Sequence, residues 1–341
     1  MTTSVFFVHK GNPDSERWMR QFPGGVPRIG GCEFVFERPR SSYDWVVVYE
    51  DLPSIESDRH PTSSSTFDCD QKNTILVTTE PASIKVYGKK YLDQFGVVLT
   101  SQEPTYISGP NVVHSQCGLQ WYVGLDSKPM ITWDELAARK PEGARGTIST
   151  VCSAKKSSRT FHTRRIELTR EFMQAFPEAD WYGRGVRPID EKANALFPYQ
   201  YHLCIENHLA KHHWTEKLAD AFLGWTMPLY VGCTNASDYF DPTSFFQFGP
   251  TATASDFEAV RGKIQSGAFE DSFEAIQQSR NLVLRDYNLF SVLADIIQSR
   301  STAGSHSSAH SAELLSRREI RKKFPIHGAL ELATKFTRQF R

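Results

Sequence analysis

The polar side chains best placed for chemistry lie at two neighbouring points of the chain. Some directly follow a short strand candidate, His202–Ile205, and the others open the next helix candidate. They are Glu206, Asn207, Thr215, Glu216 and Lys217. The carboxyl edge of a parallel sheet is where α/β proteins bind ligands. A helix N-terminus adds unpaired N–H groups and a partial positive charge, and Lys217 adds a full one. The segment therefore predicts a pocket for an anion such as a diphosphate. A Thr-capped helix with a solvated lysine is the alternative interpretation.

The elements around this segment have the pattern of an α/β protein. Short apolar runs alternate with amphipathic stretches over about the first 300 residues. In the first half, β-branched and aromatic runs predict strands at Ser4–Val8, Trp45–Tyr49, Thr74–Thr78 and Gly96–Thr100. Because these runs are almost wholly apolar, we expect them to form one buried parallel sheet.

The second half repeats this alternation. It predicts a strand at Ile148–Cys152, a helix over Arg165–Phe176 and a strand at Asp180–Tyr182. After the Thr215-capped helix, the next strand is expected at Met227–Val231. The whole pattern predicts a second α/β domain.

The domain boundaries are expected where the composition changes. A polar stretch between Pro129 and Arg145 predicts an N-terminal domain over residues 1–140 and a C-terminal domain over 146–300. Residues 301–341 are expected to form a low-complexity linker and a basic amphipathic tail.

The overall composition is that of an ordinary globular protein. The 341 residues include 39 Lys and Arg against 39 Asp and Glu, so the chain has no charge bias that would favour a nucleic-acid partner. Its six scattered cysteines suit a reducing compartment. No stretch approaches the roughly 18 to 20 apolar residues of a membrane span, and the first residues lack a signal-peptide pattern. We expect a cytoplasmic protein.

A family resemblance covers residues 199–248 most clearly. The sequence YHLCIENHLAKHHWTEKLADAFLGWTMPLYVG, followed by SDYFDPTSFFQF, resembles the donor-binding motif of glycosyltransferase family 10, the α1,3/4-fucosyltransferases, in its soluble bacterial form. An ordered composite of this length is far more specific than a single short motif. The resemblance implies the GT-B fold, in which two Rossmann-like domains face each other across a cleft.

The resemblance implies roles for the residues that match the motif. Arg165 matches the arginine that contacts the donor diphosphate, with Arg164 as the alternative. Such a contact suits arginine, whose planar guanidinium donates two parallel hydrogen bonds. The other donor-binding positions are Glu206, Asn207, His213, Thr215, Glu216 and Lys217. The sequence departs from the family pattern at His213 and Trp214, where Tyr and Val are common.

In the first half, TILVTTEPASIKVYGKKYLDQFGVVLT resembles the stretch whose strand ends in the proposed general base, which here is Glu80. Glu50 and Asp51, after WVVVY, are alternative bases at another strand end. The implied reaction is inverting transfer of L-fucose from GDP-fucose to a glycan hydroxyl. No cofactor or metal is required. Transfer of another nucleotide sugar is the alternative enzymatic function.

Two further alternatives belong to other functional classes. His208, His212 and His213 have a spacing that a zinc hydrolase could use, but the H-E-x-x-H order is absent. A non-catalytic sugar-binding scaffold would keep the fold and lose the catalytic residues, whereas Glu80, Arg165, Glu216 and Lys217 are all present.

The C-terminal segment Arg317–Arg341 carries eight Lys and Arg against two Glu, with apolar residues between them. This pattern is typical of an amphipathic helix on an anionic membrane, where a lipid-linked or surface glycan such as lipopolysaccharide is assembled. A solvated basic tail is the alternative.

Overall fold

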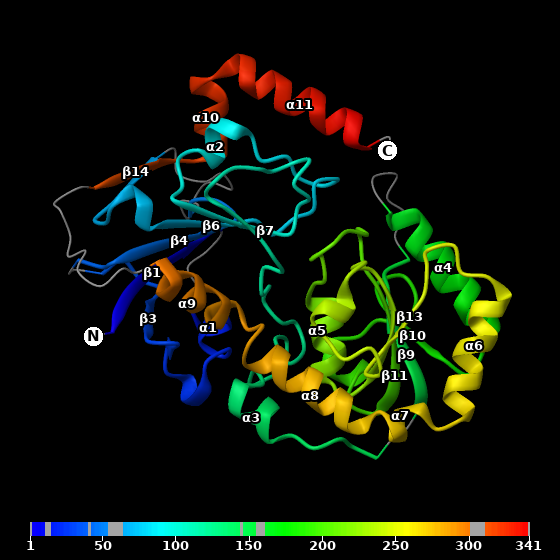
Figure 1. Cartoon of the computed structure of the whole chain (residues 1–341). Helices are drawn as coiled ribbons and strands as arrows, with labels where there is room; N and C mark the ends of the chain where they lie inside the picture. Colours follow the sequence, from blue (N-terminus) through cyan, green and yellow to red (C-terminus); the bar gives the residue numbers. More distant parts are fainter. Residues whose placement is uncertain are drawn as a thin grey trace. The chain divides into compact units, whose positions relative to one another are not determined.

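The computed structural model describes residues 2–10, 15–39, 42–53, 64–143, 146–154, 161–300 and 311–339. The chain divides into two compact units (Figure 1). Unit 1 comprises Met1–Gly118 and Leu289–Arg341, and unit 2 comprises Leu119–Asn288.

Unit 1 is built on a seven-stranded sheet with the order β2-β3-β1-β4-β6-β7-β8. All neighbouring strands are parallel except β2 and β3. The strands are β1 (Thr3–His9), β2 (Arg28–Ile29), β3 (Cys32–Val35), β4 (Trp45–Tyr49), β6 (Thr74–Val77), β7 (Val97–Thr100) and β8 (Val112–His114). The four strands predicted in the first half are all present, and they lie in this one sheet.

Alternating side chains of these strands form two apolar layers, as the two-residue period of a strand requires. On one face, Val8, Val48 and Leu76 pack with Tyr91 of the short helix α2 (Lys89–Leu92). On the other face, Phe7 contacts Phe290 of α9 (Leu289–Arg300), with ring centroids 5.4 Å apart. The short helix α1 (Glu16–Met19) adds Trp18 to this second layer.

The C-terminal segment is an integral part of unit 1. β14 (Ala312–Leu315) pairs antiparallel with β5 (Ser64–Phe67), and the helices α10 (Arg317–Lys323) and α11 (Pro325–Gln339) follow it. Leu314 is fully buried and Ile320 is 5% exposed, both within the layer that covers the first face of the sheet. Only part of the predicted basic tail is therefore exposed: Ile326 and Leu330 of α11 are 76% and 59% accessible.

Unit 2 contains a parallel five-stranded sheet with the order β10-β9-β11-β12-β13. The strands are β9 (Gly146–Val151), β10 (Asp180–Tyr182), β11 (Tyr199–Ile205), β12 (Met227–Val231) and β13 (Phe246–Gln247). Every strand predicted in the second half is present. The predicted helix is α4 (His162–Ala175), and the Thr215-capped helix is α5 (Glu216–Leu223).

Helices cover both faces of this sheet (Figure 1). Leu203 and Leu229 pack with α4 and α6 (Ala254–Gln265), whereas Cys204 and Tyr230 pack with α5 and α8 (Phe273–Leu284). The remaining helices of unit 2 are the short α3 (Trp133–Ala138) and α7 (Ala268–Asp271). Two α/β units, each with a mainly parallel sheet, confirm the predicted fold class. That the two domains face each other across a cleft stays a prediction.

The unit boundaries differ from the predicted 1–140, 146–300 and 301–341. Trp121 is 1% exposed in the core of unit 2, so the segment after Gly118 belongs to that unit and not to the first. Conversely, Phe290 lies 4.2 Å from Phe22 by ring centroids, which places α9 in unit 1. The sequence pattern marks where elements begin but not which core an element joins. Within the described residues, none of the helices is both long and apolar enough to cross a bilayer.

Candidate functional site

The site in unit 2 begins where β11 ends. Glu206 continues the strand ladder, since its N–H donates to the Val231 carbonyl at 2.8 Å. Its side chain is completely buried. Room for it depends on Gly232, because a Cβ there would lie 2.5 Å from Cγ of Glu206 and 2.3 Å from the hydroxyl of Tyr230. The small residue after the β12 strand is thus explained by the carboxylate beside it.

Glu206 connects the end of β11 to the start of α5. Thr215 donates to Oε1 of Glu206 from its N–H at 2.8 Å and to Oε2 from its hydroxyl at 2.6 Å. The Thr215 hydroxyl also accepts the N–H of Lys217 at 3.4 Å, which caps the helix. Because Glu206 is enclosed, it positions the helix start and offers no surface to a ligand.

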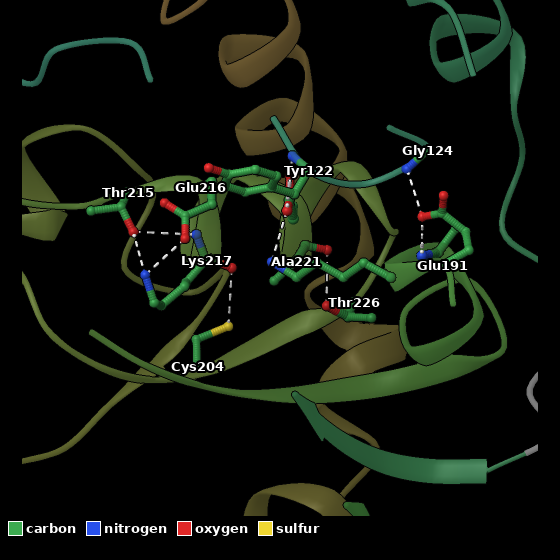
Figure 2. Close-up of polar contacts among 12 residues, drawn as sticks. Tyr122, Gly124, Glu191, Cys204, Thr215, Glu216, Lys217, Ala221 and Thr226 are labelled. Carbon is green, nitrogen blue, oxygen red and sulfur yellow. Dashed lines mark hydrogen bonds and ion pairs between the residues drawn. The ribbon is translucent and has the colours of Figure 1, made fainter. Parts of the chain in front are cut away.

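Lys217 contacts Thr215 and Glu216 (Figure 2), and its ammonium also lies near the carboxylate of Glu206. Its Nζ is 2.8 Å from Oε1 of Glu216 and 3.5 Å from Oε2 of Glu206, and it donates to the Thr215 hydroxyl at 3.2 Å. The side chains of Lys217 and Glu216 are 21% and 18% exposed. They are the charged groups of this cluster that a ligand can reach directly.

Burial and neighbouring charges set the ionisation of these groups. Burial disfavours the charged form of Glu216, but Lys217 and Lys192 overcome it and lower the pKa of this carboxyl. Burial also opposes the charge of Lys217, and Glu216 with Glu206 raises the pKa of the ammonium above its ordinary value. Burial raises the pKa of Glu206. The accessible groups are therefore a carboxylate and an ammonium at neutral pH.

Arg165 reaches the site from α4. It is 8% exposed, and its Nη1 donates to Oδ1 of Asn207 at 2.6 Å. Its Nε is buried and, among the described residues, has no hydrogen-bond partner. Arg164, the alternative, forms an ion pair with Glu171 instead: its Nη1 and Nη2 donate to the two carboxylate oxygens at 2.7 and 3.0 Å. The structure brings Arg165 and Asn207 together, and a contact of this pair with a phosphate stays a prediction.

A second, buried ion pair, between Lys192 and Asp220, lies next to this cluster and was not predicted. Asp220 of α5 is fully buried, accepts from Lys192 Nζ at 2.7 Å and accepts from the N–H of Tyr122 at 3.1 Å. Glu191, 9% exposed, likewise accepts the N–H of Gly124 at 2.9 Å (Figure 2). The only sequence signal was an aspartate among the apolar residues that follow Lys217 in α5. Its partner could not be deduced from spacing.

The histidines of the preceding loop have structural contacts. His213 is 3% exposed and its ring centroid lies 5.5 Å from that of His208. His212 adopts a left-handed backbone with φ of 62°, and its Nδ1 lies 2.5 Å from the hydroxyl of Tyr239. Within the described residues, no group of three His, Cys, Asp or Glu side chains is arranged to hold a metal ion. Donor binding by His213 stays a prediction.

Glu80 lies in unit 1, three residues beyond the end of β6. Its side chain is exposed, and its carbonyl accepts from Nε2 of Gln102 at 2.8 Å. Of the alternatives, Asp51 is 5% exposed and accepts the N–H of Leu52 at 2.9 Å, which gives it a structural role. Glu80 is thus an accessible carboxylate at the carboxyl edge of the unit 1 sheet.

Comparison with known proteins finds only distant similarity. No family model matches the sequence, and neither does any curated protein. A crystal structure of an alpha1,3-fucosyltransferase with GDP-fucose has 14% identity and a TM-score of 0.47, over 83% of this chain and 91% of that one. The glycosyltransferase WaaG, involved in lipopolysaccharide biosynthesis, has 11% identity and a TM-score of 0.43, over 86% of this chain and 99% of that one. Similarity at this level does not assign the chain to a family.

Proposed function

We propose that the chain is an inverting glycosyltransferase that moves L-fucose from GDP-fucose to a hydroxyl group of a glycan. The observation that carries the proposal is the placement of Lys217, Arg165 and the start of α5 at the carboxyl edge of the unit 2 sheet. The motif resemblance over residues 199–248 supports the same site and supplies the identity of the sugar.

The cations of the site suit a diphosphate. Lys217 contributes a charge, and α5 contributes N–H groups and the positive end of its dipole. Arg165 contributes a planar guanidinium whose buried Nε has no hydrogen-bond partner in the part of the chain that the structure describes. Asn207 orients that guanidinium through its Oδ1. Preorganised cations of this kind stabilise the charge that develops on the departing diphosphate, which is usually the largest contribution to catalysis.

Glu216 is assigned to the hydroxyl groups of the donor. Because Lys217 and Lys192 overcome the effect of burial and lower the pKa of this carboxyl, it remains an ionised hydrogen-bond acceptor. Ionised carboxylates accept from the hydroxyls of sugars and ribose. Asn207 would contact the nucleotide beside it.

The proposed reaction is a single displacement. The Glu80 carboxylate removes the proton of the acceptor hydroxyl, whose oxygen forms a bond to the anomeric carbon of fucose. The bond from that carbon to the diphosphate oxygen breaks, and its electron pair leaves with GDP. Configuration at the anomeric carbon is inverted because attack comes from the face opposite the leaving group.

A thermal-shift screen of nucleotides tests the donor. GDP and GDP-fucose should raise the melting temperature of the full-length chain, because a ligand that binds only the folded state stabilises it. UDP, UDP-glucose and UDP-galactose should not. Stabilisation by UDP-sugars alone would point to transfer of another sugar. If no nucleotide stabilises the chain and GDP-fucose is not slowly hydrolysed, a non-catalytic scaffold becomes the better explanation.

The exposed face of α11 suits a membrane surface on which a glycan acceptor is assembled. Ile326 and Leu330 lie four residues apart and are exposed, and the preceding Arg318, Lys322 and Lys323 are basic. Sedimentation with vesicles rich in anionic lipid tests this contact with the Ile326→Ser, Leu330→Ser double variant. Removal of everything after residue 310 is unsuitable, because it would also remove β14 from unit 1. Equal sedimentation of wild type and variant would exclude the contact.

A further inference from the structure

The strand order of unit 1 reverses at β1. The chain passes from β1 to β3 on one side and then returns to the other side of β1 with β4. In open α/β sheets, such a switch point leaves a crevice outside the carboxyl ends of the two central strands, where ligands bind. Lys10 follows β1 directly and Glu50 follows β4 directly. Their side chains meet there, with Nζ of Lys10 3.4 Å from Oε1 of Glu50.

Glu50 has an unfavourable backbone conformation. Its φ is 77°, in the left-handed region that non-glycine residues avoid. The conformation is held from both sides, since the Glu50 N–H donates to the Val77 carbonyl at 3.0 Å and the Tyr91 hydroxyl donates to the Glu50 carbonyl at 3.4 Å. Backbone strain of this kind clusters at functional sites. Here the left-handed backbone of Glu50 accompanies a carboxylate that lies at the switch point, next to Lys10.

Lys85 supplies the second cation of this cluster. Its side chain is 12% exposed, and its Nζ lies 2.6 Å from the same oxygen of Glu50 that Lys10 meets. Both lysines thus contact Oε1, and within the described residues no ion pair or hydrogen bond involves Oε2. The Glu50 side chain is 26% exposed, so a ligand can reach it.

The cluster is linked to the proposed base. A single amide group, Nε2 of Gln102, donates to the carbonyl of Glu80 at 2.8 Å and to the carbonyl of Lys85 at 2.9 Å. The turn from Glu80 to Lys85 is therefore anchored at both ends by one side chain. A molecule bound by Glu50 and Lys85 would lie beside the segment that carries Glu80.

We infer that Glu50 and Lys85 form a subsite for the hydroxyl groups of the acceptor carbohydrate. Oε2 of Glu50 accepts from one hydroxyl, and the remaining N–H groups of Lys85 donate to its neighbour, which matches the alternating donors and acceptors of a vicinal diol. Because two lysines hold Glu50 in its ionised form, it binds the acceptor and Glu80 keeps the role of base. The inference rests on the proposed function for the nature of the ligand.

A printed array of defined glycans, probed with fluorescently labelled full-length chain, tests the subsite. The wild type should bind a subset of the glycans. Glu50→Gln and Lys85→Met should bind the same subset about tenfold more weakly, as expected when a hydrogen bond to a charged group is lost. The matched control is Lys89→Met, which removes an exposed ion pair to Asp93 in the same unit and should bind like the wild type.

Folding of the variants is checked by their melting temperatures. If Glu50→Gln or Lys85→Met does not fold, Lys10→Met replaces it, because Lys10 is 41% exposed. This variant should weaken glycan binding about threefold. Unchanged binding in the folded variants, or a wild type that binds no glycan, would overturn the inference.

Calorimetric titration with GDP distinguishes this inference from the proposed function. Variants with weaker glycan binding should bind GDP like the wild type. A wild type that binds glycans but not GDP would contradict only the proposed transferase activity.

Discussion

Thr215 donates to both carboxylate oxygens of Glu206, from its N–H at 2.8 Å and from its hydroxyl at 2.6 Å. The two residues are nine apart in sequence, and their contact joins the end of β11 to the residue that caps α5. This contact holds the first turn of α5 at the sheet edge. Both Glu216 and Lys217 depend on it for their placement.

Replacement of Glu206 should therefore act on folding as well as on binding. Glu206→Gln keeps the side-chain shape but loses one acceptor oxygen and the charge beside Lys217, so we expect a loss of about 2–3 kcal/mol in unfolding free energy. Urea unfolding measures it. Glu216→Gln leaves the contact between Glu206 and Thr215 intact. It should weaken GDP-fucose binding and cause a smaller loss of stability than Glu206→Gln. Equal losses of stability in the two variants would contradict the positioning role.

Lys217 should act mainly on the nucleotide. Lys217→Met removes a cation from the start of α5, and the affinity for GDP should fall about tenfold or more, because hydrogen bonds to charged groups contribute about 1.5–3 kcal/mol. Calorimetric titration measures the affinity. Lys211→Met, in the exposed part of the preceding loop, is the matched control and should bind GDP like the wild type. A similar decrease in both variants would show a general charge effect.

Arg165 and Arg164 are adjacent but should differ in their effect. Arg165→Lys loses the planar fork next to Asn207, and the affinity for GDP should fall about tenfold. Arg164→Lys loses the bidentate contact with Glu171, whose side chain is 41% exposed, and should leave GDP affinity unchanged. Titration of both variants with GDP separates these roles. A larger loss in Arg164→Lys would transfer the phosphate contact to that residue.

The C-terminal strand should contribute to the stability of unit 1. Leu314→Ala empties a fully buried position in β14, for which we expect a loss of about 2–5 kcal/mol in unfolding free energy. Ile326→Ala, at a 76% exposed position of α11, should change stability by less than about 0.5 kcal/mol. Chemical denaturation followed by fluorescence compares the two. An unchanged Leu314→Ala variant would mean that β14 is dispensable.

Much of the fold was predictable because the central strands of both sheets are buried on two faces. Runs such as Trp45–Tyr49 and Met227–Val231 are apolar throughout, and both appear with the predicted bounds. Short strands such as β3 (Cys32–Val35), whose four residues include the charged Glu33, were missed. The assignment of Trp121 and Phe290 to a core also could not be predicted, because it depends on contacts between residues far apart in sequence.

The candidate site was predictable where the residues lie next to one another. Glu206, Asn207, Thr215, Glu216 and Lys217 follow a strand and open a helix, so the local pattern is sufficient to bring them together. Lys192 and Asp220 are 28 residues apart, and no local pattern joins them. The burial of Glu206 also could not be predicted from the sequence, because it depends on the space that Gly232 leaves beside the carboxylate.

The last prediction concerns Lys85 and pH. Burial lowers the pKa of its ammonium to about 8 from 10.5, with a further contribution from the charge of Arg317, while Glu50 acts in the opposite direction. Between about pH 8 and 10.5 the unfolded chain therefore binds a proton that the folded chain has released. Stability should rise with pH over this window. Relative to Lys85→Met, the wild type should gain about 2 kcal/mol in unfolding free energy between pH 7 and pH 9.5.

Comparison with Lys85→Met is needed because other groups also titrate in this range, and their contributions cancel between the two chains. Urea unfolding at the two pH values measures the difference. Lys89→Met provides the control, since Lys89 is 83% exposed and its removal should leave the pH dependence of the wild type unchanged. If the difference between wild type and Lys85→Met stays constant with pH, the lysine keeps an ordinary pKa and its burial against Glu50 imposes no cost on the charged form.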